Sequence, residues 1–182
     1  MPNVHDRRRF VLPLAAAALA GTLASGTWAA ESAIKRGAYL VAIGSCTDCH
    51  TPGHLLGAPD MSRFLGGSDV GFAIPGMGVF VGRNLTPDKE TGLGNWTTRQ
   101  IVAAITTGKR PDGRMLAPIM PYGNLALLKP ADALAIAAYL KSLPPVSNKV
   151  PGPFGPSDQP TSFVMTVLPA DAYNAMPKAP PK

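Results

Sequence analysis

The sequence predicts a single all-α domain in which three or more helices are joined by long loops. Three stretches carry helix-forming residues between capping and stop signals. The 182 residues include 19 glycines and 20 prolines, which favours extensive loops. The segment from Thr51 to Asn95 holds many glycines and lacks clear periodicity, so it is interpreted as loops. Because a domain averages roughly 150 residues, one domain is expected.

The first predicted helix runs from Ser32 to Ile43. Ser32 is a suitable N-cap because its hydroxyl can accept a hydrogen bond from the first helical turn. Gly44 follows the last helical residue, and glycine there permits the left-handed backbone that ends many helices. The helix therefore ends shortly before Cys46, the first of two cysteines.

Two further helices are predicted downstream. The second begins near Thr97, whose hydroxyl forms a capping box with Gln100, and it ends at Gly108. The third begins around Pro130 and ends before Pro144, because proline suits the first turn of a helix and not its interior. A wide apolar face is expected to bury this last helix on several sides. Members of that face are Leu134, Ala137, Ala138 and Leu140.

Residues 1–30 have the pattern of a cleaved export signal. Three arginines, Arg7 to Arg9, precede an apolar stretch from Phe10 to Leu23. That stretch is shorter than the roughly 18 residues of a membrane-spanning helix. Small residues follow, and cleavage after Ala29 is expected, with Ala30 as a near alternative. The other interpretation is an amphipathic or anchoring helix that the mature chain retains.

The charge balance and hydropathy exclude some partners. The chain has 17 lysines and arginines against 11 acidic residues, a net charge of +6. Removal of residues 1–30 takes away three arginines and one aspartate and leaves +4. No cluster of basic residues interleaved with aromatic residues remains, so nucleic acid is not an expected partner. No remaining apolar run is long enough for a stable membrane span.

The two cysteines of the chain occur in the order Cys46-Thr47-Asp48-Cys49-His50. C-x-x-C-H is the attachment motif of c-type haem. Each thiol can add across one vinyl group of the porphyrin, and a histidine directly after the second cysteine lies close under the iron. The motif therefore predicts one covalent haem c held by Cys46 and Cys49, with His50 as an axial ligand of the iron.

Three further interpretations of the cysteine pair compete with haem attachment. The thiols could form a structural disulfide in an oxidising compartment. A thioredoxin-like redox pair would follow a strand of a βαβ unit, and the preceding segment does not alternate as a strand does. Zinc binding would add His54 to the motif, but structural zinc sites usually join two ligand pairs across a longer loop. The complete pentapeptide favours covalent haem.

A methionine is the expected second axial ligand, because histidine and methionine together give electron-transfer cytochromes. Two candidates, Met115 and Met120, lie in the irregular segment between the second and third helices. Met120 lies between Pro118 and Pro121, whose restricted backbones would help to hold a thioether on iron. The alternative is that Met120 fills a gap in the core, as most methionines do. The remaining methionines outside the signal are Met61, Met77, Met165 and Met176.

Six landmarks occur in order between about Ile34 and Val150. They are Arg36-Gly37-Ala38-Tyr39-Leu40, Cys46-Thr47-Asp48-Cys49-His50-Thr51-Pro52, Asn84-Leu85-Thr86-Pro87-Asp88, Thr91-Gly92-Leu93-Gly94-Asn95-Trp96, Met120-Pro121-Tyr122 and Ala138-Tyr139-Leu140. In this order they resemble the class I c-type cytochromes. Within that family, the chain is similar to the single-haem domains in cytochrome subunits of periplasmic alcohol and aldehyde dehydrogenases.

This resemblance implies a class I cytochrome c fold, in which long loops wrap one haem and the last helix crosses the first. It implies that Gly37 permits close approach at the crossing and that Tyr139 packs beside it. It also implies that Met120 is the second axial ligand. Large membrane-bound dehydrogenase subunits of the family often carry three haem domains, whereas this chain has one C-x-x-C-H motif.

The carboxylates of a bound haem, its propionates, need charged or N–H partners when they are buried. Arg83, Asn84 and Trp96 are the candidate donors. The alternative places Trp96 in the core and Arg83 on the solvated surface.

Together these features predict a periplasmic electron-transfer protein that is not itself an enzyme. Residues 31–150 would form the cytochrome domain and residues 151–182 a Pro-rich tail, whose segment from Phe163 to Leu168 is expected to dock on the domain or on a partner. A periplasmic dehydrogenase would donate electrons, and an oxidase or another cytochrome would accept them. The alternatives are a tightly bound subunit of a dehydrogenase and, less favoured, a haem enzyme or sensor.

Overall fold

The computed structural model describes residues 31–177 of the chain. The chain divides into two compact units, Met1–Ser32 and Ala33–Lys182, and the second contains the hydrophobic core. The predicted export signal of residues 1–30 lies outside the described residues. Among residues 31–177, no helix is both long enough and apolar enough to span a bilayer.

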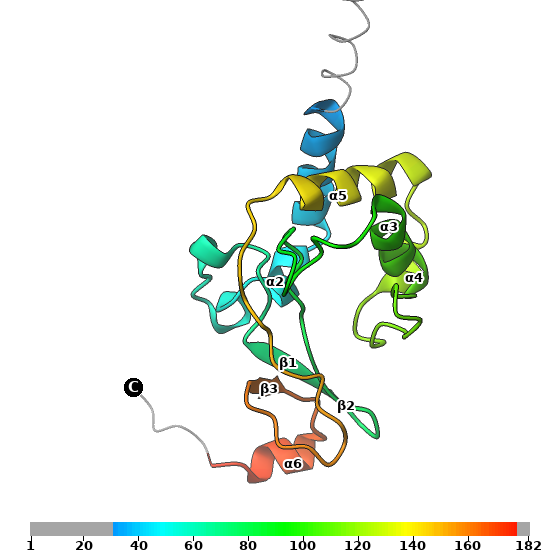
Figure 1. Cartoon of the computed structure of the whole chain (residues 1–182). Helices are drawn as coiled ribbons and strands as arrows, with labels where there is room; N and C mark the ends of the chain where they lie inside the picture. Colours follow the sequence, from blue (N-terminus) through cyan, green and yellow to red (C-terminus); the bar gives the residue numbers. More distant parts are fainter. Residues whose placement is uncertain (1–30, 178–182) are drawn as a thin grey trace, which may run out of the picture. The chain divides into compact units, whose positions relative to one another are not determined.

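The described residues form helices, short 3-10 turns and a small sheet (Figure 1). A helix covers residues 31–43 and is called the N-terminal helix below. The α-helices that follow are α2 (Cys46–His50), α3 (Thr98–Thr107), α4 (Tyr122–Leu125), α5 (Pro130–Ser142) and α6 (Ala170–Ala175). The 3-10 turns are η1 (His54–Leu56) and η2 (Met61–Arg63), and the strands are β1 (Val70–Ile74), β2 (Gly78–Val81) and β3 (Phe163–Met165).

The three predicted helices are confirmed. In the first, residue 31 is already helical, so Ser32 is not its N-cap, and the left-handed residue after the helix is Ser45 rather than Gly44. This helix ends where the Gly44 N–H donates to the Leu40 carbonyl at 2.9 Å. Helix α3 has the predicted capping box, in which Thr97 and Gln100 each bond the other's backbone N–H. Its C-cap is Gly108, whose φ of 74° is a backbone conformation that glycine adopts at little cost. Helix α5 begins at Pro130 and ends before Pro144.

The face that α5 buries differs from the prediction. Leu134 is 51% exposed, so its assignment to the buried face was wrong. Apolar residues occur around the whole circumference of α5, and composition alone therefore does not select the buried side. Packing against the rest of the core selects it instead. The residues of α5 that are buried are Ala133, Ala135, Ile136, Ala137 and Leu140.

The all-α prediction is confirmed only in part, because a three-stranded sheet accompanies the helices. Strands β1 and β2 form an antiparallel hairpin, and β3 pairs parallel to β1, giving the order β2-β1-β3. The first pair in the parallel register is Val70 with Phe163. The segment predicted to dock thus adds a strand to the sheet, although the side chains of β3 stay exposed. Strands of only three to five residues, two of which contain glycine, give little periodic signal.

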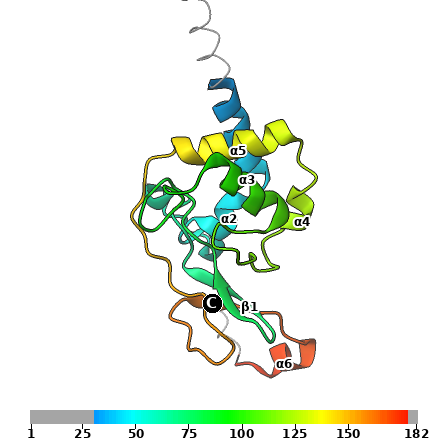
Figure 2. The same ribbon diagram turned by 45° about the vertical axis from the view of Figure 1, so that its right-hand side comes forward.

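The crossing of the first and last long helices is as the sequence resemblance implies. In both Figure 1 and Figure 2, α5 lies across the N-terminal helix. A Cβ on Gly37 would overlap the carbonyl oxygen of Ala135 and lie 2.7 Å from the Cβ of Tyr139. Only glycine therefore allows this separation between the two backbones.

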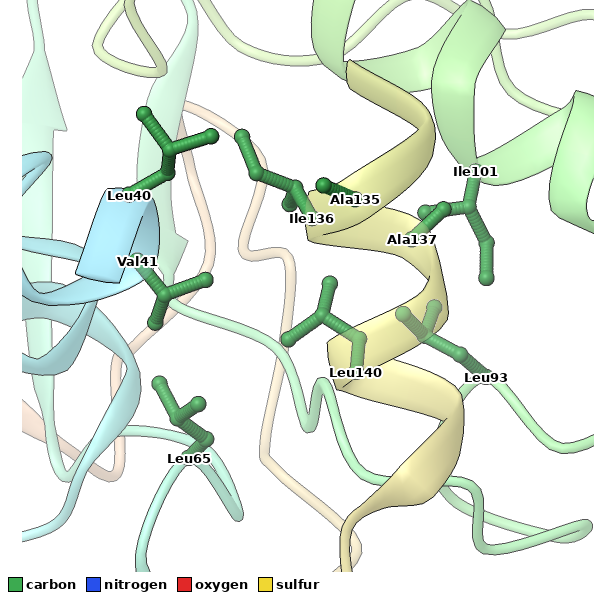
Figure 3. Close-up of a cluster of buried hydrophobic side chains, with 9 residues drawn as sticks. All are labelled: Leu40, Val41, Leu65, Leu93, Ile101, Ala135, Ile136, Ala137 and Leu140. Carbon is green, nitrogen blue, oxygen red and sulfur yellow. The ribbon is translucent and has the colours of Figure 1, made fainter. Parts of the chain in front are cut away.

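The hydrophobic core is centred on this crossing. Figure 3 shows Leu40 and Val41 of the N-terminal helix facing Ile136 and Leu140 of α5. Side chains from α3 and from two loops complete the cluster, and Trp96 packs at its border. The core thereby fixes the N-terminal helix, whose end leads directly into the two cysteines. The remaining members of the cluster are Leu65, Leu93, Ile101, Ala135 and Ala137.

Candidate haem site

The short helix α2 carries Cys46, Cys49 and His50. Successive residues of an α-helix are separated by about 100° around its axis, so positions 46, 49 and 50 fall within an arc of about 100°. A left-handed residue, Ser45 with φ of 52°, separates α2 from the N-terminal helix. The two thiols and the imidazole are thereby presented on one side of a helix, as attachment to one face of a porphyrin requires.

The two cysteines are free thiols in this structure, and both are half-buried. Burial raises the pKa of each thiol, with a smaller contribution to the pKa of Cys49 from the charge of Asp48. Both cysteines are therefore held in the protonated form. The structure thus presents two unpaired thiols rather than a disulfide.

The surroundings of the motif support neither a thioredoxin-like pair nor a zinc site. A helix precedes the motif rather than the strand of a thioredoxin-like unit. His54, the fourth donor that zinc would require, places Nε2 3.3 Å from a carboxylate oxygen of Asp48. Within residues 31–177, no three His, Cys, Asp or Glu side chains are grouped as ligands of one metal ion. The donor set fits attachment of a haem better than a tetrahedral zinc site.

The imidazole of His50 is oriented by a backbone carbonyl. Its Nδ1 lies 2.7 Å from the carbonyl oxygen of Arg83. Because a carbonyl oxygen only accepts hydrogen bonds, Nδ1 carries the proton and Nε2 keeps its lone pair. Burial lowers the pKa of His50, which keeps the ring neutral. A neutral imidazole with one nitrogen fixed by a carbonyl is the usual form of a metal-ligating histidine.

Gly82 belongs to the site and was missed in the sequence. A Cβ at this position would overlap the carbonyl oxygen of Cys49 and would lie 3.4 Å from Nδ1 of His50. The absent side chain lets the backbone of residues 82–83 lie directly against α2, which brings the Arg83 carbonyl to His50. The available signal was a glycine immediately after the apolar residues of β2 and before Arg83.

Met120 lies in the irregular segment that residues 108–121 form between α3 and α4, here called the strap. Its N–H donates to the Ala117 carbonyl at 2.9 Å, and its own carbonyl accepts from the Tyr122 N–H at 2.8 Å. These bonds hold the Met120 backbone in a turn, and its side chain is half-buried. Met115, the competing candidate, is 56% exposed. Axial ligation by Met120 stays a prediction.

Arg83 and Trp96 lie in a region of concentrated positive charge. The Arg83 guanidinium is half-buried, and burial together with the charges of Arg110 and Arg114 lowers its pKa. Arg110 lies over the Trp96 ring, 5.6 Å from its centroid. Asp112 pairs with both Arg110 and Arg114, and no carboxylate of the described residues pairs with Arg83. The cluster therefore contains three guanidinium groups and one carboxylate, which leaves positive charge that two propionates would balance.

Asn84 does not have the free N–H that the propionate role requires. The residue is 1% exposed, and its Nδ2 donates to the Thr91 hydroxyl at 3.0 Å and to the Val146 carbonyl at 2.6 Å. Its Oδ1 accepts from the Thr86 N–H and hydroxyl at 2.9 and 2.7 Å. All four hydrogen-bonding positions of the amide are therefore used within the protein. Asn84 ties together loops around the core instead.

Comparison with known proteins identifies relatives of this chain, although no protein-family model matches it. It is 36% identical over 124 residues to the cytochrome c subunit of a quinone alcohol dehydrogenase from Gluconobacter oxydans. It is 35% identical over 128 residues to the fructose dehydrogenase cytochrome subunit of Gluconobacter japonicus. Each match covers 66% of this chain.

The chain is a homologue of dehydrogenase cytochrome c subunits. A third relative, a subunit of the nicotinate dehydrogenase of Pseudomonas putida, is 35% identical over 127 residues and 69% of this chain. This cytochrome homologue spans 24% of the length of the alcohol and fructose dehydrogenase subunits, and its match spans 10% of the nicotinate dehydrogenase subunit. It therefore corresponds to a fraction of each relative.

Proposed function

We propose that this chain is a periplasmic electron-transfer protein that carries one covalent haem c with histidine and methionine as axial ligands. Cys46 and Cys49 form the thioether links, and His50 and Met120 hold the iron. Residues 1–30 direct export and are removed, residues 31–150 form the cytochrome domain, and residues 151–182 are its C-terminal tail. The homology to dehydrogenase cytochrome subunits supports haem c as the cofactor and a dehydrogenase as the partner.

The observation that carries the proposal is the state of His50. Its Nδ1–H is fixed by the Arg83 carbonyl at 2.7 Å, and its ring stands on the same side of α2 as the two free thiols. A histidine that only packs in a core needs neither a fixed Nδ1–H nor a position beside two cysteines. A haem ligand needs both, because its ring must be neutral, oriented and adjacent to the two attachment points.

A bound haem c would supply an iron that alternates between the ferric and ferrous states. The residues of this chain set how easily it does so. A thioether ligand from Met120 favours the ferrous form, so a positive reduction potential is expected. Arg83, Arg110 and the indole N–H of Trp96 are the proposed partners of the propionates. These groups bind and orient the cofactor and transfer no proton to a substrate.

An electron carrier is favoured over a catalyst because the named relatives are cytochrome subunits of dehydrogenases. The electrons would pass from a dehydrogenase to an oxidase or to another cytochrome. A permanently bound subunit differs from a diffusing carrier only in the lifetime of its complex. Co-purification of the exported chain with a dehydrogenase at physiological salt would identify the bound form, and isolation of a monomeric cytochrome would identify the carrier.

The proposal is tested by absorption spectra of the oxidised and reduced protein, produced together with a c-type haem maturation system. Low-spin spectra with the weak sulfur-to-iron charge-transfer band are expected. Met120→Ala should abolish this band, give iron that binds added ligands and lower the reduction potential. Met115→Ala is the matched control, and it should retain the band because Met115 is exposed. Loss of the band in Met115→Ala but not in Met120→Ala would show that Met115 is the axial ligand. Absence of covalent haem in the wild type would disprove the proposal.

A further inference from the structure

Arg83 makes contacts at both of its ends. Its backbone carbonyl accepts the Nδ1–H of His50 at 2.7 Å. Its guanidinium donates to the carbonyl of Val150 at 2.6 Å and also to the carbonyl of Gly152. One residue therefore connects the proposed axial histidine to the start of the C-terminal tail.

Ordinary ion pairing does not explain where this guanidinium lies. It is half-buried, and within residues 31–177 no carboxylate pairs with it. Burial and the charges of Arg110 and Arg114 oppose its positive charge, as its lowered pKa indicates. The carbonyl oxygens of Val150 and Gly152 are the protein contacts that hold it. Because arginine presents several N–H groups in a rigid plane, two such bonds fix both its position and its orientation.

The same tail segment is attached to the strand that precedes Arg83. Phe154 and Val79 of β2 exchange two backbone hydrogen bonds, each 2.9 Å long. Farther along the tail, β3 pairs with β1. Residues 150–154 therefore contact the chain on either side of Gly82, through the backbone of β2 and through the Arg83 side chain. A displacement of this segment would be transmitted to the backbone that bears the Arg83 carbonyl.

We infer that residues 150–154 hold Arg83 as a positioning residue for His50, and that the C-terminal tail thereby sets the reduction potential of the haem. This inference rests on the proposed function. A short Nδ1–H to carbonyl bond raises the electron density on Nε2 and so favours ferric iron. If the tail releases Arg83, this bond lengthens and the ferrous form becomes more stable relative to the ferric form. Loss of the tail contacts should therefore raise the potential.

The test must separate this effect from the charge of Arg83, which acts in the opposite direction. A nearby cation favours the ferrous form, so its removal would lower the potential. Gly152→Ala displaces the tail without changing any charge. Gly152 has a left-handed φ of 74°, and an added Cβ would lie 2.9 Å from the Phe154 ring. The matched control is Gly76→Ala in the turn between β1 and β2, where φ is 75° and no described atom lies within 4 Å of the added Cβ.

The experiment measures the reduction potential of the haem-loaded full chain and of each variant by spectroelectrochemistry. Gly152→Ala should raise the reduction potential, so that the ratio of ferric to ferrous protein falls about threefold at a fixed ambient potential. This rise is roughly half of the 59 mV that corresponds to a tenfold change in the ratio for one electron. Arg83→Lys keeps the charge but loses the paired geometry, and it should shift the ratio in the same direction. Gly76→Ala should leave the ratio unchanged.

Two results would overturn the inference. One is an unchanged potential in both Gly152→Ala and Arg83→Lys, and the other is an equal shift in Gly76→Ala. Should Gly152→Ala not fold, the hydrogen-exchange measurement below decides, because Arg83→Lys would also change the contact that Arg83 is proposed to make with a propionate. A wild-type protein without low-spin covalent haem would instead disprove the proposed function. As a second measurement, coupling requires that the amides of Val150, Gly152 and Phe154 exchange hydrogen at different rates in the ferric and ferrous proteins.

Discussion

The approach of the N-terminal helix to α5 at Gly37 allows a stability prediction with a definite sign. Gly37→Ala adds one methyl group, which would overlap the Ala135 carbonyl oxygen. It would also lie 2.6 Å from the Ala135 carbonyl carbon and 2.7 Å from the Tyr139 Cβ, where carbon atoms normally approach to about 3.5 Å. None of these atoms can rotate away, because they belong to the backbone or are attached directly to it. The two helices must therefore separate by roughly 1 Å.

The magnitude follows from two opposing effects. Alanine is favoured over glycine inside a helix by about 1 kcal/mol. Overpacking of a well-packed contact costs about 1 to 3 kcal/mol, and separation of the helices also loosens the contacts between Leu40 and α5 that Figure 3 shows. Because the loosened contacts add to the overpacking, a net loss of about 1 to 2 kcal/mol is expected. For a domain of this size, that corresponds to a decrease in Tm of about 2 to 8 °C.

Thermal and denaturant unfolding of the haem-loaded protein, followed by circular dichroism, would measure this loss. Gly123→Ala is the matched control, because Gly123 lies in α4 with no described atom within 4 Å of the added Cβ. The control should be as stable as the wild type or more stable by up to about 1 kcal/mol. The reasoning fails if Gly37→Ala is as stable as the wild type.

Two further predictions concern helix ends and acid stability. Thr97→Ala removes the capping box with Gln100 and should cost about 1 kcal/mol in denaturant unfolding, whereas Thr97→Ser should cost much less. Asp132 accepts from Arg36 of the N-terminal helix at 2.9 Å, and this bond lowers the pKa of the carboxyl. Its contribution is therefore present above about pH 4 and is lost as the pH falls through the lowered pKa. Asp132→Asn should flatten the decline of stability between about pH 5 and pH 2, and an unchanged slope would contradict this role.

The features that sequence patterns predicted are local ones. The box of Thr97 and Gln100, the stop at Gly108 and the proline boundaries of α5 each involve residues within a few positions of one another, and all are confirmed. The haem motif is local in the same sense, because five consecutive residues on one helix present its donors. Sequence patterns of this kind predict a helix and its ends wherever residues close in sequence supply the hydrogen bonds or the backbone conformation that end it.

The features that sequence patterns missed depend on contacts between distant segments. Strand β3 joins β1 across more than 90 residues, and neither strand is long enough to show an alternating pattern. Leu134 was misplaced because an all-round apolar helix does not indicate which side meets the core. Asn84 was assigned from its residue type, and its actual partners come from loops seven and 62 residues away. In each case the deciding contact lies outside any local window.

The positive charge of this protein has a local component that the sequence total conceals. Arg83, Arg110 and Arg114 are close enough for the last two to lower the pKa of the first, and Asp112 is the carboxylate that pairs among them. Arg83 is half-buried, whereas the Arg114 side chain is 63% exposed and is paired with Asp112. Repulsion by the two neighbouring cations therefore opposes burial of Arg83 in particular, unless a further anion lies close to it. The two propionates of the proposed haem would bring two negative charges to this cluster. Attachment of the haem would therefore relieve repulsion that Asp112 alone leaves uncompensated, which couples haem attachment to the stability of the strap and the tail.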